Sequence, residues 1–129
     1  MTKKYMFFVL TSMILPIFAF SQKAYELVNY GGKTQNLIVK FSLADGYLAG
    51  CEIRTINIKT KKKAKFLPEN GNAYIEKKIK FYHYSTSDNT YNDYFIINGI
   101  AESYDSVPTK FLGTYYYNCK TFRVTLTKL

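Results

Sequence analysis

The chain has 129 residues and a formal net charge of +9, with 18 lysines and arginines against 9 acidic residues. This length fits one small domain. A single histidine and two cysteines are too few for the ligand sets of structural zinc domains, and no glycine-rich phosphate loop is present. We therefore expect no metal and no cofactor.

Residues 1–21 have the three-part pattern of a secretory signal peptide. Two lysines precede an apolar run over residues 5–20, and Ala19 and Ser21 stand where a signal peptidase needs small side chains. We expect cleavage after Ser21 and one periplasmic or secreted domain over residues 22–129. A membrane anchor is the alternative, but the apolar run is shorter than the roughly 20 residues that span a bilayer. The mature form is expected to have no membrane span.

After residue 22 apolar residues recur mostly at every second position, the period of a strand with one buried face. Leu37, Val39, Phe41 and Leu43 share one parity, and a similar alternation ends the chain. The pattern predicts eight strands, over residues 24–30, 35–43, 47–58, 63–67, 73–84, 91–100, 110–117 and 120–128.

Turn-forming pairs separate these segments, among them Gly31-Gly32, Asp45-Gly46 and Asn98-Gly99. Asp45-Gly46 is the strongest hairpin signal, because both residues tolerate the positive φ of a tight turn. Residues 48–53 are also compatible with a helical turn, and Asn98-Gly99 with a bulge inside one longer strand.

Eight short antiparallel strands predict a single small all-β domain. A meandering, lipocalin-like barrel is the expected architecture, and a two-sheet sandwich is the alternative. The likeness to lipocalins is architectural only, and it implies no function.

Lysines concentrate between Asn57 and Lys65. If this segment were extended, alternate side chains would project from one face about 7 Å apart and could bind anionic groups. The alternative is a solvated hairpin tip, where lysines oppose edge-to-edge association, and we expect the tip. The candidate anion patch comprises Lys59, Lys61, Lys63, Lys65, Lys78 and Lys80.

Tyrosine is abundant, with 13 residues, and tryptophan is absent. Tyrosine provides contact area at low entropic cost, so tyrosines on the outer face are candidates for binding a small molecule or a glycan. Cross-strand ladders that stabilise the sheet are the alternative role. The candidates are Tyr82, Tyr84, Tyr91, Tyr94, Tyr115 and Tyr117.

Cys51 and Cys119 are the only cysteines. An exported chain meets an oxidising compartment, so we expect a disulfide between them, with two free thiols as the alternative. Asn118-Cys119 stands where Asn-Gly is usual in a hairpin, and cysteine disfavours the left-handed backbone that glycine adopts freely.

His83 shares parity with Ile79 and Phe81, which favours a packed or strand-end histidine over a catalytic one. A Ser-His-Asp set is too local along the chain to converge as triads do, and no carboxylate pair has the density of a calcium loop. The residues considered for these sets are Ser85, Ser87, Asp88, Asp93, Glu102 and Asp105.

The expected function is a non-catalytic binding domain of the cell envelope or exterior that takes a small molecule or a glycan. A protein-interaction factor (inhibitor, immunity or assembly factor) that docks on an acidic protein through a sheet face is the alternative. A small hydrolase is a remote alternative, and we expect no nucleic-acid partner.

Overall fold

The computed structural model describes residues 25–73, 76–87 and 89–129. The predicted signal peptide lies outside this part of the chain.

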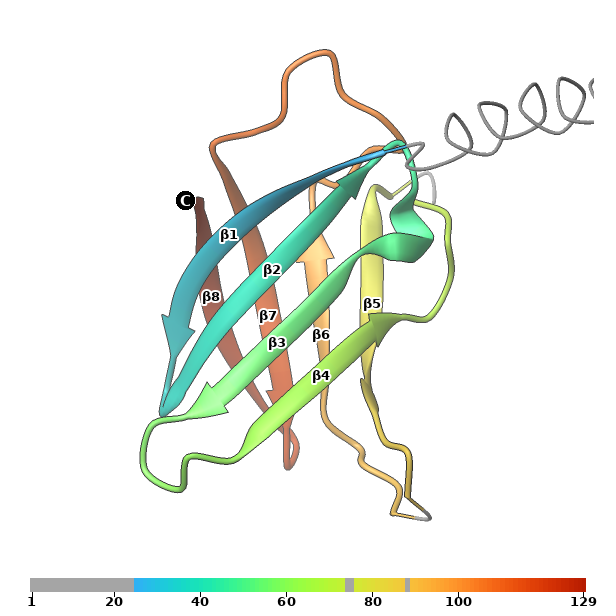
Figure 1. The fold of residues 1–129 in the computed structure, drawn as a ribbon. Coiled ribbons are helices and arrows are strands. Elements are labelled where there is room, and N and C mark those ends of the chain that lie inside the picture. Colours follow the sequence, from blue (N-terminus) through green and yellow to red (C-terminus); the bar gives the residue numbers. More distant parts are fainter. Residues whose placement is uncertain (1–24, 74–75, 88) are drawn as a thin grey trace, which may run out of the picture.

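Eight antiparallel strands close into a barrel, in which each strand pairs with its neighbours in sequence and β8 pairs back with β1 (Figure 1). The predicted meandering all-β barrel is therefore confirmed, and the sandwich alternative is wrong. The strands are β1 (Glu26–Thr34), β2 (Leu37–Asp45), β3 (Glu52–Asn57), β4 (Lys63–Pro68), β5 (Lys78–Tyr84), β6 (Tyr94–Asn98), β7 (Lys110–Tyr117) and β8 (Lys120–Lys128).

The first predicted turn is misplaced, because Gly31 and Gly32 lie inside β1. A Cβ atom added to Gly32 would lie 2.3 Å from the main-chain oxygen of Thr125 in β8. Glycine here permits the close approach of two backbones where the barrel closes. The chain turns instead at Gln35, whose φ is 51°.

The connection from β2 to β3 contains a 3₁₀ turn, η1 (Leu48–Gly50). Asp45-Gly46 does end β2, with a φ of +86° at Gly46, but it does not form a tight two-residue hairpin. The helical-turn alternative is thus confirmed for residues 48–50, whereas Glu52 and Ile53 already belong to β3. Asn98 ends β6 and Gly99 has a φ of +77°, so this pair marks a strand end and not a bulge.

Aromatic and aliphatic side chains fill the half of the barrel near η1. The Phe41 ring lies 5.8 Å from those of Tyr30 and Phe81 and 5.5 Å from that of Phe111, measured between centroids. Burial of such a side chain stabilises the fold by about 1.5–3 kcal/mol. This packed half holds the walls in place around the opposite half, which is hollow.

Candidate functional site

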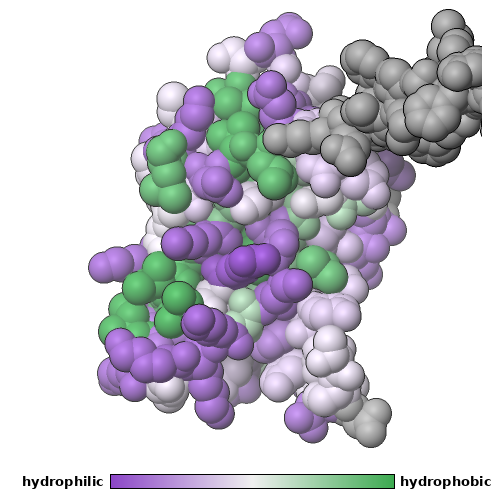
Figure 2. All heavy atoms as spheres, viewed as in Figure 1, coloured by the Kyte–Doolittle hydropathy of each residue, from purple (hydrophilic) through white to green (hydrophobic). Residues whose placement is uncertain are grey.

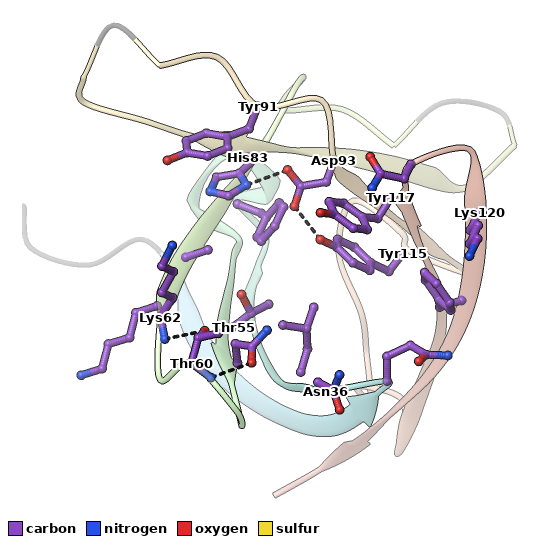
Figure 3. A pocket seen from close by; sticks show the side chains of 18 residues that line it. Asn36, Thr55, Thr60, Lys62, His83, Tyr91, Asp93, Tyr115, Tyr117 and Lys120 are labelled. Atoms are coloured by element: carbon purple, nitrogen blue, oxygen red, sulfur yellow. Dashed lines mark hydrogen bonds and ion pairs between the residues drawn. The ribbon is translucent and has the colours of Figure 1, made fainter.

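A cavity of about 610 Å³ opens at the end of the barrel away from η1, where the β1–β2, β3–β4, β5–β6 and β7–β8 connections lie (Figure 3). Small-molecule sites commonly have volumes of about 300–1,000 Å³. Part of the wall is apolar and comes from strands β2, β4 and β8. These apolar side chains are Leu37, Ala64, Phe66 and Phe122.

A chain of three polar side chains crosses one wall of this cavity. The Nδ1 atom of His83 in β5 lies 2.7 Å from Oδ1 of Asp93, which directly precedes β6. The Tyr115 hydroxyl of β7 donates to Oδ2 of the same carboxylate at 2.6 Å (Figure 3). Asp93 therefore links three consecutive strands at the cavity, with one partner on each oxygen.

These contacts determine which atoms of His83 and Tyr115 donate hydrogen bonds. A carboxylate only accepts hydrogen bonds, so Nδ1 of His83 carries the proton and Nε2 is left as the ring atom that can bind a ligand. Burial, reinforced by the Asp93 carboxylate, raises the pKa of Tyr115, because a buried phenolate beside a negative charge is unfavourable. Tyr115 therefore remains a donor in neutral solution.

Aromatic rings surround the histidine on both sides. Tyr91 stacks on the His83 imidazole, with centroids 3.9 Å apart and planes 8° apart, and Phe66 approaches it at 4.7 Å. The Tyr91 side chain is half exposed, so the imidazole contacts both an exposed ring and the buried Phe66 ring. This arrangement restricts the orientation of the imidazole in the wall.

The rim of the cavity is positively charged. Lys62 and Lys63 from the β3–β4 hairpin and Lys120 from the start of β8 line the opening. Among the described residues, none of these three amines forms an ion pair with a carboxylate. A negatively charged group at the mouth would therefore meet uncompensated positive charge.

The six predicted tyrosines divide between two places. Tyr82, Tyr84 and Tyr94 lie on the strands of the outer face, as predicted. Tyr115 is buried in the cavity wall, so its assignment to the outer face is wrong, whereas Tyr91 and Tyr117 line the cavity and remain half exposed. The sequence KFLGTYYY of β7 has large residues at both parities, so its pattern does not identify the inner face.

The outer tyrosines form cross-strand pairs that stabilise the sheet, which was the alternative to a binding role. Tyr94 lies opposite both Tyr82 and Tyr116 in register, and its ring stacks on that of Tyr116 at 4.6 Å. Lys80 Nζ covers the Tyr94 ring at 4.4 Å, and Lys65 lies 5.9 Å from the Tyr84 ring. Contacts of this kind stabilise a sheet.

The lysine-rich segment forms a hairpin tip, as expected. Asn57 Oδ1 accepts hydrogen bonds from the amides of Lys59 and Thr60 at 2.9 and 3.0 Å, and Lys61 has a φ of 62°. Lys59 and Lys61 are thus turn residues, so the four alternate lysines do not form one extended row. Of the predicted patch, Lys63, Lys65, Lys78 and Lys80 lie on strands.

The predicted disulfide is absent from the structure, where both cysteines are free. Cys51 follows η1 and is buried, whereas Cys119 is exposed in the β7–β8 turn at the opposite end of the barrel. A disulfide requires Cα atoms within about 7 Å. Cys119 has a φ of 60°, which confirms the left-handed backbone expected for it.

His83 faces inward and packs near the end of β5, in agreement with its parity. The two serines considered for a Ser-His-Asp set hydrogen-bond to each other, with Ser85 Oγ 3.0 Å from Ser87 Oγ. Asp88 lies outside the described residues. Of the other carboxylates, Glu102 accepts a hydrogen bond from the Ala73 amide at 2.7 Å.

Sequence reasoning missed the pairing of His83 with Asp93. A signal was present, because Asp93 has the same parity as the buried Phe95 and Ile97. A carboxylate at the inward position just before a buried strand requires a partner, and the inward His83 lies on the preceding strand.

Among the described residues, no three His, Cys, Asp or Glu side chains are placed to hold a metal ion. No helix in that part of the chain has the length and apolar character needed to cross a bilayer. Comparisons of the chain with protein-family models, with curated proteins and with solved structures found no match.

Proposed function

We propose that this protein is an exported, non-catalytic binding domain that holds a small apolar molecule bearing an acidic group. The single observation that carries the proposal is the cavity of about 610 Å³, which combines an apolar wall with a lysine rim. Export rests on the sequence pattern of residues 1–21.

Each part of such a ligand has a matching surface. Its apolar body would lie against Phe66 and Phe122, which contribute apolar area inside the cavity. Its acidic group would remain at the mouth, between Lys62 on one side and Lys120 on the other (Figure 3), where it is only partly desolvated. Nε2 of His83 would hydrogen-bond a polar atom between these two ends.

A catalytic role is less well supported by the same geometry. Both oxygens of Asp93 already have partners, so the carboxylate acts as a fixed link between strands. The outer tyrosines also support a glycan site less well than the cavity supports a small ligand, because Tyr94 is already covered by Lys80 and Tyr116.

Two fluorescent probes test the proposal. Anilinonaphthalene sulfonate is an aromatic anion of suitable character, and N-phenylnaphthylamine is a neutral aromatic counterpart. We expect the folded protein to bind both probes, and Ala64→Phe to weaken both, because it fills the cavity. Thr121→Phe adds a ring of the same size to an exposed position of β8 and serves as the matched control.

The charge of the rim is tested separately. Lys62→Gln combined with Lys120→Gln should weaken binding of the sulfonate by about tenfold, since the two exposed cations together contribute on the order of 1.4 kcal/mol. Binding of the neutral probe should be unaffected. If Ala64→Phe remains folded and binds both probes as the wild type does, the cavity is not the site and the proposal is wrong.

A further inference from the structure

A row of three positive side chains crosses the outer face of strands β2, β3 and β4. Lys40 lies directly opposite Arg54, and Arg54 lies directly opposite Lys65. All three residues are exposed. The next row toward the β3–β4 hairpin consists of Ile38, Ile56 and Lys63.

The two rows together line a groove of about 450 Å³ on the outside of the barrel. Figure 2, which views the molecule as Figure 1 does, shows hydrophilic and hydrophobic side chains lying next to each other on this face. The groove lies outside the barrel and the cavity inside it, although Thr55, Lys63 and Ala64 border both spaces.

The row of Lys40, Arg54 and Lys65 does not contribute to the stability of the sheet. Like charges placed directly opposite on neighbouring strands destabilise a sheet. Glu52 offsets part of this repulsion, with Oε1 at 2.6 Å from Arg54 Nε and 3.8 Å from Lys65 Nζ. Lys40 has no ion pair within the part of the chain that the structure describes. An anionic partner would relieve the remaining repulsion.

Apolar side chains beside the row indicate what kind of anion fits. Ile38 and Ile56 lie half-buried in the groove, and Ile58 is 41% exposed where the β3–β4 hairpin tip begins. Lys59, Lys61 and Lys62 follow Ile58 in this tip. A soluble polyanion has no apolar part that could contact exposed isoleucines. A lipid surface has both phosphate groups and acyl chains, so it can contact the lysines and the isoleucines together.

We propose that the outer face of β2–β4, with the adjoining hairpin tip, docks on an anionic lipid surface. The row of Lys40, Arg54 and Lys65 contacts the phosphates, and Ile58 enters the boundary between headgroups and acyl chains. Each cation near such a surface contributes about 1 kcal/mol, and the attraction decreases as salt is added. The interior of the cavity plays no part in this interaction, although Lys62 in the tip and Lys63 beside the row also line its rim.

Vesicle sedimentation tests the proposal. The wild-type protein should bind vesicles of phosphatidylcholine with phosphatidylglycerol, and the binding should weaken with added salt and be absent with phosphatidylcholine alone. Lys40→Glu combined with Lys65→Glu should weaken binding by at least about tenfold. Ile58→Ser, which leaves the charge unchanged, should weaken it severalfold. Leu37→Trp, which narrows the cavity at a residue that does not line the groove, should bind vesicles as the wild type does.

The matched control changes the net charge by the same amount elsewhere. Lys110 and Lys128 are exposed on β7 and β8, which share no pairing with β3 or β4. If Lys110→Glu with Lys128→Glu weakens binding equally, only the net charge matters and the proposal is wrong. It is also wrong if the mixed vesicles do not bind, or if soluble polyglutamate binds as tightly and is unaffected by Ile58→Ser.

Discussion

The Nδ1 atom of His83 and the Oδ1 atom of Asp93 lie 2.7 Å apart, although nine residues separate them along the chain. Their side chains are largely buried, with 14% and 10% of their surfaces exposed. A charge-assisted hydrogen bond in such surroundings is stronger than one at the surface. It fixes the start of β6 against the end of β5 and thereby shapes one wall of the cavity.

Asp93→Asn should lower the free energy of unfolding by about 1–3 kcal/mol. The amide has one acceptor oxygen for the two donors, His83 and Tyr115, so one of these contacts is lost or its donor must reorient. Urea unfolding measures the change, and Asp105→Asn at an exposed loop position is the control. An unchanged free energy for Asp93→Asn would show that the two hydrogen bonds contribute no net stability.

Alkaline solution should destabilise the fold. Burial raises the pKa values of Tyr30, Tyr104 and Tyr115 above the ordinary 10.0. The unfolded chain therefore releases these protons at a lower pH than the folded chain does. Stability is then complete below about pH 10 and is lost as the pH rises further. Urea unfolding followed by circular dichroism at several pH values measures how steeply the free energy of unfolding decreases with pH.

Tyr115→Phe isolates one contribution to this slope. The variant should be less stable than the wild type at pH 7, since Asp93 loses a donor, but its stability should decrease less steeply above pH 10. A slope as steep as that of the wild type would exclude Tyr115 as a source of the alkaline sensitivity.

Gly32→Ala should destabilise the barrel by about 1–3 kcal/mol or more, because its new methyl group meets main-chain atoms of β8 that cannot move independently. Gly31→Ala is the matched control. Its Cβ would approach only the side chain of Leu129, at 3.2 Å, which can rotate away. Thermal unfolding compares the stability of the two variants. If both lose the same stability, the close approach of β8 to Gly32 is not what makes a larger residue unfavourable there.

Cys119→Gly should stabilise the protein by about 1 kcal/mol. Asn118 and Cys119 have φ values of 48° and 60°, and glycine removes the steric penalty that cysteine has at such an angle. Cys119→Ala, which keeps a Cβ, should give little of this gain. Urea unfolding of both variants distinguishes relief of strain from simple removal of a thiol.

The two thiols should react at very different rates. Burial raises the pKa of Cys51 to about 11, and its sulfur accepts a hydrogen bond from the Ala44 amide at 3.3 Å. Cys119 is exposed. A chromogenic disulfide reagent at pH 8 should therefore modify one thiol quickly and the second only on unfolding. Release of no thiol from the unfolded protein would instead establish a disulfide.

Sequence patterns predicted the strands well where one parity is apolar and the other polar, as in β2 and β8. They failed where local signals competed with contacts distant in sequence. Gly31-Gly32 has the composition of a turn, but the approach of β8, far along the chain, determines its role. Likewise the disulfide prediction relied on the compartment, whereas the position of each cysteine depends on which end of the barrel its turn occupies.

The candidate site was predictable only in part. Parity placed His83 inside the barrel, and the lysine-rich segment was expected at a hairpin tip. The closure of eight strands places this tip, Tyr115 and Lys120 around one cavity, with Lys62 and Lys120 on opposite sides of it (Figure 3). No local pattern contains that information, because it depends on the number of strands and on their register.

The packed half and the hollow half of the barrel place different demands on the sequence. Phe41 and its neighbours near η1 stabilise the fold without contributing to the cavity wall. Substitutions among the wall residues can therefore change which molecule fits while the barrel remains folded. Under the proposed binding role, such a division would let the cavity wall be altered for a new ligand without loss of the fold, as engineering of a binding scaffold requires.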